Sequence, residues 1–436
     1  MADTGYNYLT TLDGLFKRVY ADKLETLIPS WAILQRDIAF SESARTGEDF
    51  MQPVVVQGEH GVTYAAGGAG AFAIMAPLAG QIKKAIVTGY QHVIRSSVDY
   101  ETAFSGTGGE RAFKGATAAV VESMWGSIAK RVELDLLYGQ DPTGLGTIAS
   151  LAGSDTIITF TDATWAPGIW AGMEGALINC WATTMSGHRA TAGASHSTNI
   201  TAVDLDAKSI TVGTAFASTV VGDVITIAAS SGTGTDALIA ADGPTSWKQM
   251  AGANKIITNT GTLFGISAST YNLWKGISHS AGSTDLSFGT IQDAIAKITS
   301  KGADSDINVY ISPKTWANLM NDQAALRRFD SSANTAKVVV GAQAIEFWGQ
   351  LGKISIKAHP FIKEGEAFGM SPKLWKRIGA TDVTFTRPPM SGAGQQGQFF
   401  REMVDQAGFE LRAYSHQALF THAPAKSFKI TNIVNS

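Results

Sequence analysis

The sequence predicts an α+β protein, and three features of the chain predict that class. The first is a long helical stretch, Gly109 to Gln140, in which apolar residues recur at every third or fourth position. The second is a set of glycine-punctuated, β-branched runs on both sides of it, which are typical of strands. The third is a helix, a strand and a helix with short joints between residues 290 and 322. No repeat of fixed period connects these parts.

The long helix is the strongest of these signals. At about 1.5 Å per residue it spans roughly 45 Å, which is longer than a globular helix usually needs. Opposite charges lie four positions apart beside the apolar residues, Glu110 with Lys114 and Arg131 with Asp135. One apolar stripe follows the helix: Phe113, Ala116, Val120, Met124, Ile128, Val132 and Leu136. We expect Val120 and Met124, in the middle of this stripe, to be buried.

Composition points to a protein with many neighbours. The chain has 436 residues, enough for two or three domains and a sizeable core. Its formal net charge of −3 argues against the basic surface of a nucleic-acid-reading protein. Only 16% of the residues are charged, compared with about 25% in typical soluble domains. Because the cores of subunit interfaces are depleted in charge, this composition favours a surface that is largely covered by other subunits.

Signals of secretion are weak. The only cysteine, Cys180, permits no disulfide within the chain, which fits a reducing compartment, and we expect it to be a buried small hydrophobic residue. The N-terminus lacks the pattern of a secretion signal, and no run of about 18 apolar residues is present to span a membrane. A glycosylation sequon at Asn199 therefore carries little weight.

The first hundred residues predict a helix followed by a long hairpin. Apolar residues between positions 12 and 28 follow a helical face that Pro29 ends. The β-branched segments Phe50–Gln57 and Ile82–Tyr100 then flank a weakly charged tip rich in glycine and alanine, Gly58–Gln81. One side of the second strand is expected to hold Ile86, Tyr90, Ile94 and Val98. An isolated hairpin is marginal in water, so we expect this one to lie across a neighbouring subunit.

After the long helix the chain becomes rich in strands. Residues 148–185 are apolar and contain Trp165, Trp170 and Trp181. Residues 189–243 shift to Thr, Ser, Ala, Gly and Asp, and we interpret them as a small β-rich insertion. Alternating patterns there predict two strands within 201–212, joined by a three-residue turn, and another strand at 220–229. The insertion has two cationic residues, Arg189 and Lys208, and five acidic ones: Asp204, Asp206, Asp223, Asp236 and Asp242.

Residues 247–387 predict a compact α/β module. Its first helix, Thr290–Gly302, begins with a capping box completed by Asp293 and ends at its C-terminal glycine. A strand at Ile307–Ser312 follows, and its last serine with Pro313 marks the start of the next helix. Further strands are expected at Ile356–Ile362, Glu366–Pro372 and Phe399–Ile433.

No constellation of residues points to catalysis, a cofactor or a metal. The histidines are scattered, with His188 and His196 in a loop and His416 and His422 near the end, and none lies in a zinc-binding motif. Phosphate-binding and nucleophile-elbow motifs are absent. Two carboxylate pairs at i,i+2 spacing are typical of turns and strand edges: Asp204 with Asp206, and Glu364 with Glu366. We therefore expect no enzyme activity, no cofactor and no metal, and we nominate no site residues.

Three phrases of the sequence look like those of phage coat proteins: GISASTYNLWKG (Gly265–Gly276), VYISPKTWANL (Val309–Leu319) and QAGFELRAYSHQALFTHAP (Gln406–Pro424). With the order of elements, they make the chain resemble the major capsid protein of tailed bacteriophages, whose fold is shared with herpesvirus floor domains and encapsulins. The resemblance covers nearly the whole chain. It implies an N-arm (1–45), an extended hairpin loop (46–100), a peripheral domain with a spine helix (101–147), an axial domain (148–188 and 244–387), a β-rich insertion domain (189–243) and closing strands of the peripheral domain (388–436).

The resemblance implies a structural protein that assembles through hexamers and pentamers into an icosahedral head shell around packaged double-stranded DNA. Its implied partners are copies of itself, a scaffolding protein, a portal and a decoration protein, with no sequence-specific DNA contact and no membrane. Assembly would take place in the host cytoplasm and the product would be the virion capsid. Some family members begin with a charged, helical scaffolding segment. Here the N-arm begins almost at Met1, so either a separate scaffold protein is expected or the segment is absent.

Two other classes of protein remain open at this point. A secreted or surface β-rich adhesin is favoured by the Thr/Ser/Gly-rich insertion and the sequon, and opposed by the missing signal peptide and the α/β module. An enzyme of unknown type is the third class. Within the capsid hypothesis, the acidic insertion should lie on the outside of the shell, because proteins bind DNA through cationic contacts.

Overall fold

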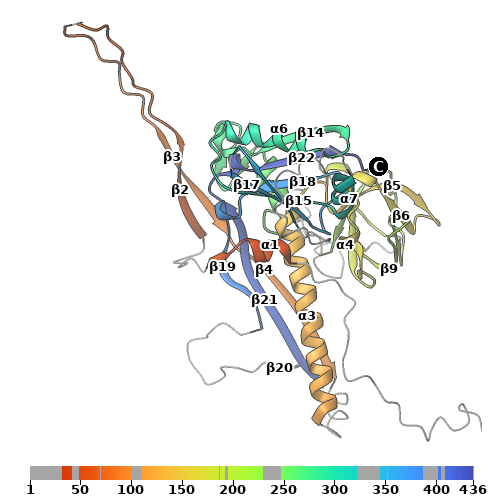
Figure 1. Ribbon diagram of the computed structural model, residues 1–436. Coiled ribbons are helices and arrows are strands. Elements are labelled where there is room, and N and C mark those ends of the chain that lie inside the picture. Colours follow the sequence, from red (N-terminus) through yellow and green to blue (C-terminus); the bar gives the residue numbers. More distant parts are fainter. Residues whose placement is uncertain are drawn as a thin grey trace, which may run out of the picture.

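The computed structural model describes residues 32–41, 49–68, 70–99, 110–185, 187–191, 195–228, 247–321, 344–350, 352–385, 401–403 and 408–435. The amphipathic segment expected between residues 12 and 28 lies outside this set. Figure 1 shows a body of sheets and short helices with two projections that leave it in different directions. One is the hairpin of β2 (Asp49–Gln57) and β3 (Gln81–Thr88). The other is built from the long helix α3 (Glu110–Tyr138) together with β4 (Tyr90–Asp99) and β21 (Gly408–Thr421).

The long helix is confirmed as α3, Glu110–Tyr138. Met124 is buried as expected, but Val120 is only half-buried, so its predicted burial is wrong. Toward its C-terminal end the helix is enclosed on every side, because residues 132–139 are all buried, including the charged Glu133 and Asp135. The pattern of one apolar stripe therefore holds for the middle of α3 and fails at its end, where α1 (Ile33–Asp37), α5 (Ala253–Thr258), β4 and β21 surround it.

A close approach of two backbone segments ends α3. Gly139 N donates to Asp135 O at 2.9 Å, and Gly252 N donates to Gly139 O at 2.8 Å. A Cβ on Gly139 would lie 2.1 Å from Met250 O, so only glycine fits here. These contacts fix the N-terminus of α5 against the C-terminus of α3.

The hairpin is confirmed, with β2 at Asp49–Gln57 antiparallel to β3 at Gln81–Thr88. The single strand expected at 82–100 is instead two strands in two sheets, because the chain leaves β3, passes Gly89 and enters β4 at Tyr90–Asp99. The face that packs on the body changes at this break. Tyr90 and Ile94 lie on the half-buried side of β4, but Ile86 is exposed, and the predicted common face is wrong for it.

A five-stranded sheet supports α3. Its centre is the 14-residue strand β21, Gly408–Thr421, which pairs antiparallel with β4 along its first part and with β19, Trp375–Thr384, along its last part. Short β1 (Phe40–Ser41) and β20 (Arg401–Glu402) complete it. The long closing strand is thus confirmed. Its partner β19 comes from the segment assigned to the axial domain, so this sheet crosses the expected boundary at residue 387.

Strands from both sides of residue 189 form one antiparallel barrel. The order is β11-β5-β6-β10-β9-β7, and β11 also pairs with β7, which closes the ring. The expected insertion at 189–243 therefore does not form a sheet of its own, because three of the six strands precede it. The turn between β9 and β10 has four residues, with Asp204 Oδ1 accepting from the backbone N–H groups of Asp206 and Ala207. The strands are β5 Gly146–Ala152, β6 Ile157–Phe160, β7 Leu177–Trp181, β9 Thr198–Asp204, β10 Ser209–Val212 and β11 Val224–Ile227, with β8 His188–Arg189 beside β7.

The α/β module is confirmed as a six-stranded mixed sheet with two amphipathic helices, α6 (Phe288–Thr299) and α7 (Pro313–Asn321). Ser312 caps α7 as predicted, accepting from Thr315 N at 3.2 Å. The cap of α6 is Ser287 rather than Thr290, since Ser287 Oγ accepts from the Thr290 N–H. The last strand also lies in this sheet and not with the other closing strands. The sheet order is β14 Ile277–Thr284, β22 Phe428–Ile433, β18 Ala367–Met370, β15 Ile307–Ile311, β17 Gly352–Ala358 and β16 Ala344–Gly349.

Burial along α3 predicts where the helix tolerates truncation. Leu136→Ala removes a fully buried side chain and should cost about 2–5 kcal/mol of unfolding free energy. Val120→Ala, on the half-buried turn, should cost less than about 1.5 kcal/mol. Urea unfolding followed by tryptophan fluorescence measures both. Equal losses would contradict the increase in burial along the helix.

Candidate functional site

The residues considered for chemistry in the sequence are spread over the fold. Cys180 is buried in the barrel, as predicted, and burial together with the charge of Asp223 raises the pKa of its thiol to about 12. That carboxylate is itself fully buried and receives two hydrogen bonds from Arg189, at 2.8 and 3.0 Å. Asp223 therefore belongs to an internal ion pair and not to the acidic surface expected of the insertion.

Two of the scattered histidines meet. The His188 ring stacks on the His196 ring at 4.8 Å, centroid to centroid, and contacts Trp181 in a tilted arrangement. Burial, with the nearby His196, lowers the pKa of His188 to about 4, so the ring is neutral at neutral pH. His416 and His422 lie elsewhere, on and just after β21. Within the described residues, no group of three or more His, Cys, Asp or Glu side chains is arranged to hold a metal. In the same part of the chain, no helix is both long and apolar enough to cross a bilayer.

Both carboxylate pairs have structural partners. Asp204 closes the β9–β10 turn, as predicted for a turn residue. Glu364 and Glu366 lie in the loop before β18, so they do not share a strand face. Glu364 forms an ion pair with Lys208 at 3.3 Å, which connects the turn of the barrel to this loop.

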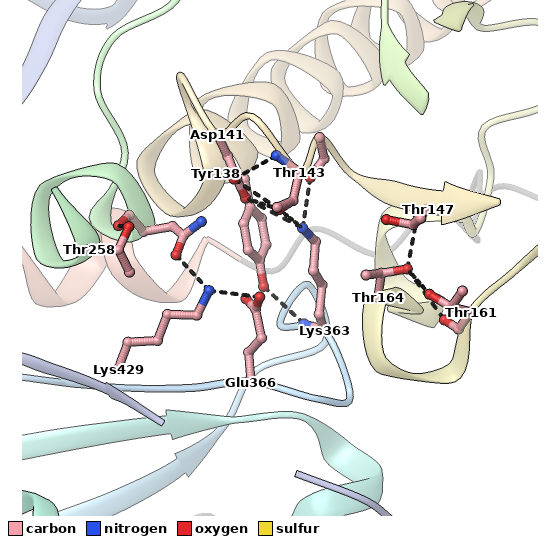
Figure 2. Close-up of polar contacts among 12 residues, drawn as sticks. Tyr138, Asp141, Thr143, Thr147, Thr161, Thr164, Thr258, Lys363, Glu366 and Lys429 are labelled. Atoms are coloured by element: carbon pink, nitrogen blue, oxygen red, sulfur yellow. Dashed lines mark hydrogen bonds and ion pairs between the residues drawn. The ribbon is translucent and has the colours of Figure 1, made fainter. Parts of the chain in front are cut away.

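The loop that contains these glutamates joins three parts of the molecule (Figure 2). Lys363 donates from its backbone to Tyr138 Oη at 2.9 Å, at the end of α3. Its ammonium donates to Gly144 O at 2.7 Å and pairs with Asp141 at 3.4 Å, just before the barrel. In the α/β sheet, Lys429 binds Glu366 at 2.7 Å. A helix, a barrel and a sheet are therefore held at one point by buried charges.

The protonation of this network follows from its charges. Burial acts to raise the pKa of Asp141, but Lys363 and Lys429 outweigh it, and the pKa is lowered. Burial and the neighbouring Glu366 carboxylate raise the pKa of Tyr138 well above its usual range. At neutral pH the network therefore holds ionised Asp141 and a neutral phenol that accepts a backbone hydrogen bond.

A second buried carboxylate, Glu133, anchors the segment 32–41. Its oxygens accept from Leu34 N at 2.5 Å and Gln35 N at 3.1 Å, and contact His359 Nε2 at 2.9 Å. Because His359 Nδ1 accepts from the Phe361 N–H, Nε2 carries the ring proton and donates to Glu133. Three donors thus surround a carboxylate with no exposed surface.

Other side chains complete the attachment of this segment. Asp37 accepts from Tyr310 Oη at 2.7 Å and Lys357 Nζ at 2.6 Å, both on the α/β sheet. Arg377 of β19 donates to the carbonyls of Gln35 and Ile38. We name residues 32–41 the strap, because they bind α3, the α/β sheet and the β19–β21 sheet together. Sequence analysis missed the strap and the buried charges, since Glu133 and His359 are 226 positions apart and no motif links them.

The hairpin has two different faces. One packs on the body, where Phe50 lies 5.9 Å from the Phe420 ring and Ala85 and Val87 are buried. The other, here named the outer hairpin face, exposes an apolar ladder in which Met51 pairs with Ile86 and Val55 with Ile82. These four side chains are 50, 39, 65 and 68% exposed respectively. Further apolar side chains are exposed toward the tip: Val62, Tyr64, Phe72, Ile74, Met75 and Leu78.

Comparison with known proteins defines the fold. No protein-family model matches the sequence, and no curated protein matches it. Among solved structures, the chain is similar to the capsid asymmetric unit of cyanophage A-1(L), with 12% identity, 98% of this chain and 99% of that chain covered, and a TM-score of 0.52. It is also similar to the capsid of a native GTA particle, with 8% identity, coverage of 99% and 100%, and a TM-score of 0.50. The chain therefore has the fold of these capsid structures, and the α+β capsid fold that the sequence resemblance implied is confirmed.

The buried position of Glu133 predicts a large effect of a conservative change. Glu133→Gln keeps the side-chain size but places an amide NH₂ against N–H donors, and should cost about 3 kcal/mol. Glu346→Gln is the matched control, because Glu346 is 51% exposed and pairs with the exposed Lys353. That change should cost at most about 1 kcal/mol. Thermal and urea unfolding measure both variants, and similar small losses would show that Glu133 is not the anchor of the strap.

Proposed function

We propose that this protein is the major capsid protein of a tailed phage. Many copies assemble through hexamers and pentamers into an icosahedral head shell that encloses double-stranded DNA, and the protein resides in the virion capsid. The observation that carries the proposal is the outer hairpin face, four neighbouring exposed apolar side chains on a projection of a chain with a capsid fold. The exposed pair Pro53–Lys84 separates the two apolar pairs of this face. Apolar side chains gathered on an exposed projection are typical of a surface that binds a partner.

The shape of the hairpin supports contact with another copy. Its two strands leave the body together, and the tip lies well beyond the other sheets (Figure 1). Among the described residues, the body covers only the inner face, through Phe50, Ala85 and Val87. A neighbouring subunit would remove the exposed ladder from water, at roughly 25 cal/mol for each Å² of apolar surface buried. The low charge content of the chain fits the same use.

The polar clusters support a structural role over catalysis. The described carboxylates and lysines around Glu133 and Lys363 bind one another or the backbone and hold the parts of the fold together. We therefore propose that the protein is not an enzyme and needs no cofactor. The structural likenesses give the adhesin hypothesis no support.

The remaining partners follow from a shell function. We propose a scaffolding protein that guides assembly, a portal at one vertex and a decoration protein on the outer surface, with DNA held inside without sequence-specific contacts. The division into N-arm, extended loop, peripheral domain and axial domain is proposed with one change from the sequence-based limits. Residues 146–227 would form a single barrel unit, because their strands close one ring.

Direct observation of assembly tests the proposed function. The full-length protein is overexpressed with and without its scaffolding protein, and the product is examined by sedimentation and electron microscopy. Closed shells, or hexamers and pentamers, are expected. A protein that stays monomeric at high concentration with the scaffold present would overturn the proposal.

The outer hairpin face predicts a separation of folding from assembly. Changing Met51 and Ile82 together to lysine should leave subunit stability within about 0.5 kcal/mol, because both side chains are exposed. The same variant should fail to form shells, because two charges would be buried without partners at the contact. Leu205→Lys, at an exposed leucine of the barrel turn, is the control for adding lysine to an apolar surface position. Normal shells from the hairpin variant would show that this face does not bind a neighbour.

We propose that the barrel lies on the outside of the shell, and its charge supports this location. Residues 144–228 contain six acidic and two basic residues, a net charge of −4, although Asp223 is internally paired. Packaged DNA would repel this unit. An epitope inserted in the exposed turn at residues 205–207 should therefore bind antibody on intact, DNA-filled particles. Detection only after the particles are disrupted would contradict this placement.

A further inference from the structure

The hairpin joins the body through a joint of one residue. Thr88 is the last residue of β3 and pairs with Asp49 in the hairpin, whereas Tyr90 is the first residue of β4 and pairs with Gln417 of β21. Gly89 alone separates the two sheets. Between β3 and β4, a change in the angle of the hairpin would be absorbed at or beside this glycine, while the Ile86 N–H bond to Phe264 O at 3.0 Å also holds the base of the hairpin.

The joint is held from the β21 side by a histidine ring. A Cβ on Gly89 would lie 2.1 Å from His416 Cε1, so the ring occupies the space that a side chain would need. His416 Nδ1 accepts from the Ala380 N–H at 3.2 Å, which ties the ring to β19. The His416 ring is therefore packed directly against Gly89.

On the other side, β4 is fastened to the long helix through His92, two residues beyond the start of the strand. Its Nε2 lies 2.5 Å from Asp135 Oδ2, and Asp135 Oδ1 accepts from Gln249 Nε2 at 2.8 Å. The other ring nitrogen, Nδ1, is buried and has no hydrogen-bond partner in the described part of the chain. The charged groups that act on His92 are Asp135 and Arg131, both of α3, while β21 places the uncharged Ser415 opposite it.

We propose that the His92–Asp135 contact is a proton-controlled clasp that fixes the base of the hairpin to α3. Loss of the proton from His92 loosens β4 and lets the hairpin change its angle at Gly89. The clasp is a property of the single subunit, so it does not depend on the proposed function. In a shell, it would let one hairpin adjust to neighbours at different angles.

The direction of the effect follows from the charges. Burial acts to lower the pKa of His92, but the hydrogen bond and the charge of Asp135 outweigh it, and the pKa is raised above 6.5. The clasp is therefore fully formed at a pH below 6.5 and weakens as the pH rises through the raised pKa. Above it, a hydrogen bond between neutral and charged groups replaces one between two charged groups, and the bond to Asp135 becomes weaker.

Hydrogen exchange of the unassembled full-length subunit tests the clasp. Protection of β4, residues 90–97, is measured by mass spectrometry at pH 5.5, 7 and 8.5 and corrected for the intrinsic exchange rate. The ratio of wild-type to His92→Gln protection should fall with pH, by up to tenfold for each unit by which the pKa is raised. His279→Gln, a change on the distant strand β14, is the control and should leave β4 protection unchanged.

Two further measurements keep the outcome decisive. Asp135→Asn retains an acceptor oxygen and should abolish the pH dependence of the ratio, even if His92→Gln folds poorly. In the wild type alone, β4 should lose protection relative to residues 418–421 of β21 as the pH rises. The proposal is overturned if the ratio of wild-type to His92→Gln protection of β4 stays within about twofold from pH 5.5 to 8.5, and if β4 protection in the wild type and in Asp135→Asn shows the same dependence on pH.

Discussion

Glu133 is a carboxylate with no exposed surface, and the arrangement of the body depends on what surrounds it. An isolated buried charge is costly, and its cost is met only if donors are held in place around it. Here the donors come from segments far apart in the sequence, two backbone N–H groups of the strap and the ring of His359. Because the carboxylate sits on α3, each donor fixes the position of its own segment relative to the long helix. A few ångströms of displacement would leave the charge without partners.

The Lys363 network does the same on the other side of α3. Lys363 reaches the end of the helix and the entry to the barrel, while Lys429 of the α/β sheet binds Glu366 in the same loop. Buried ion pairs add little net stability compared with apolar packing, but they require their partners to be held at well-defined positions. The body is therefore a unit in which helix, barrel and sheets have one arrangement. The hairpin differs, since one face packs on Phe420 and the other exposes an apolar ladder.

Local features of the fold could be predicted from the sequence. The periodicity of α3, the two strands of the hairpin and the Ser312 cap depend on residues a few positions apart, and all three are present. The resemblance to phage coat proteins predicted the fold class. Failures arose where distant segments decide the outcome. The chain leaves β3 at Gly89, where His416 of a distant strand fills the side-chain space, and β22 joins the α/β sheet beside β14. No local pattern contains that information.

The candidate site illustrates the same limit in chemical terms. The hairpin surface was predictable in outline, because alternation and a weakly charged tip are visible in the sequence, but placing Ile86 on one side of a single strand with Tyr90 and Ile94 was wrong. Glu133 and Asp135 look like solvated charges on an amphipathic helix, yet both are buried. Their partners, His359 and His92, come from strands or loops on either side in the sequence. Pairing of this kind depends on tertiary contacts and cannot be derived from spacing along one helix.

The central claim is that the body is complete in one subunit and that the outer hairpin face is completed by another. Hydrogen exchange compared between free subunits and the assembled particle tests both halves at once. The account predicts slow, unchanged exchange in the strap and at the end of α3, and a gain of protection in β2, β3 and the tip on assembly. Unchanged exchange in the hairpin, or protection of the strap gained only on assembly, would contradict it.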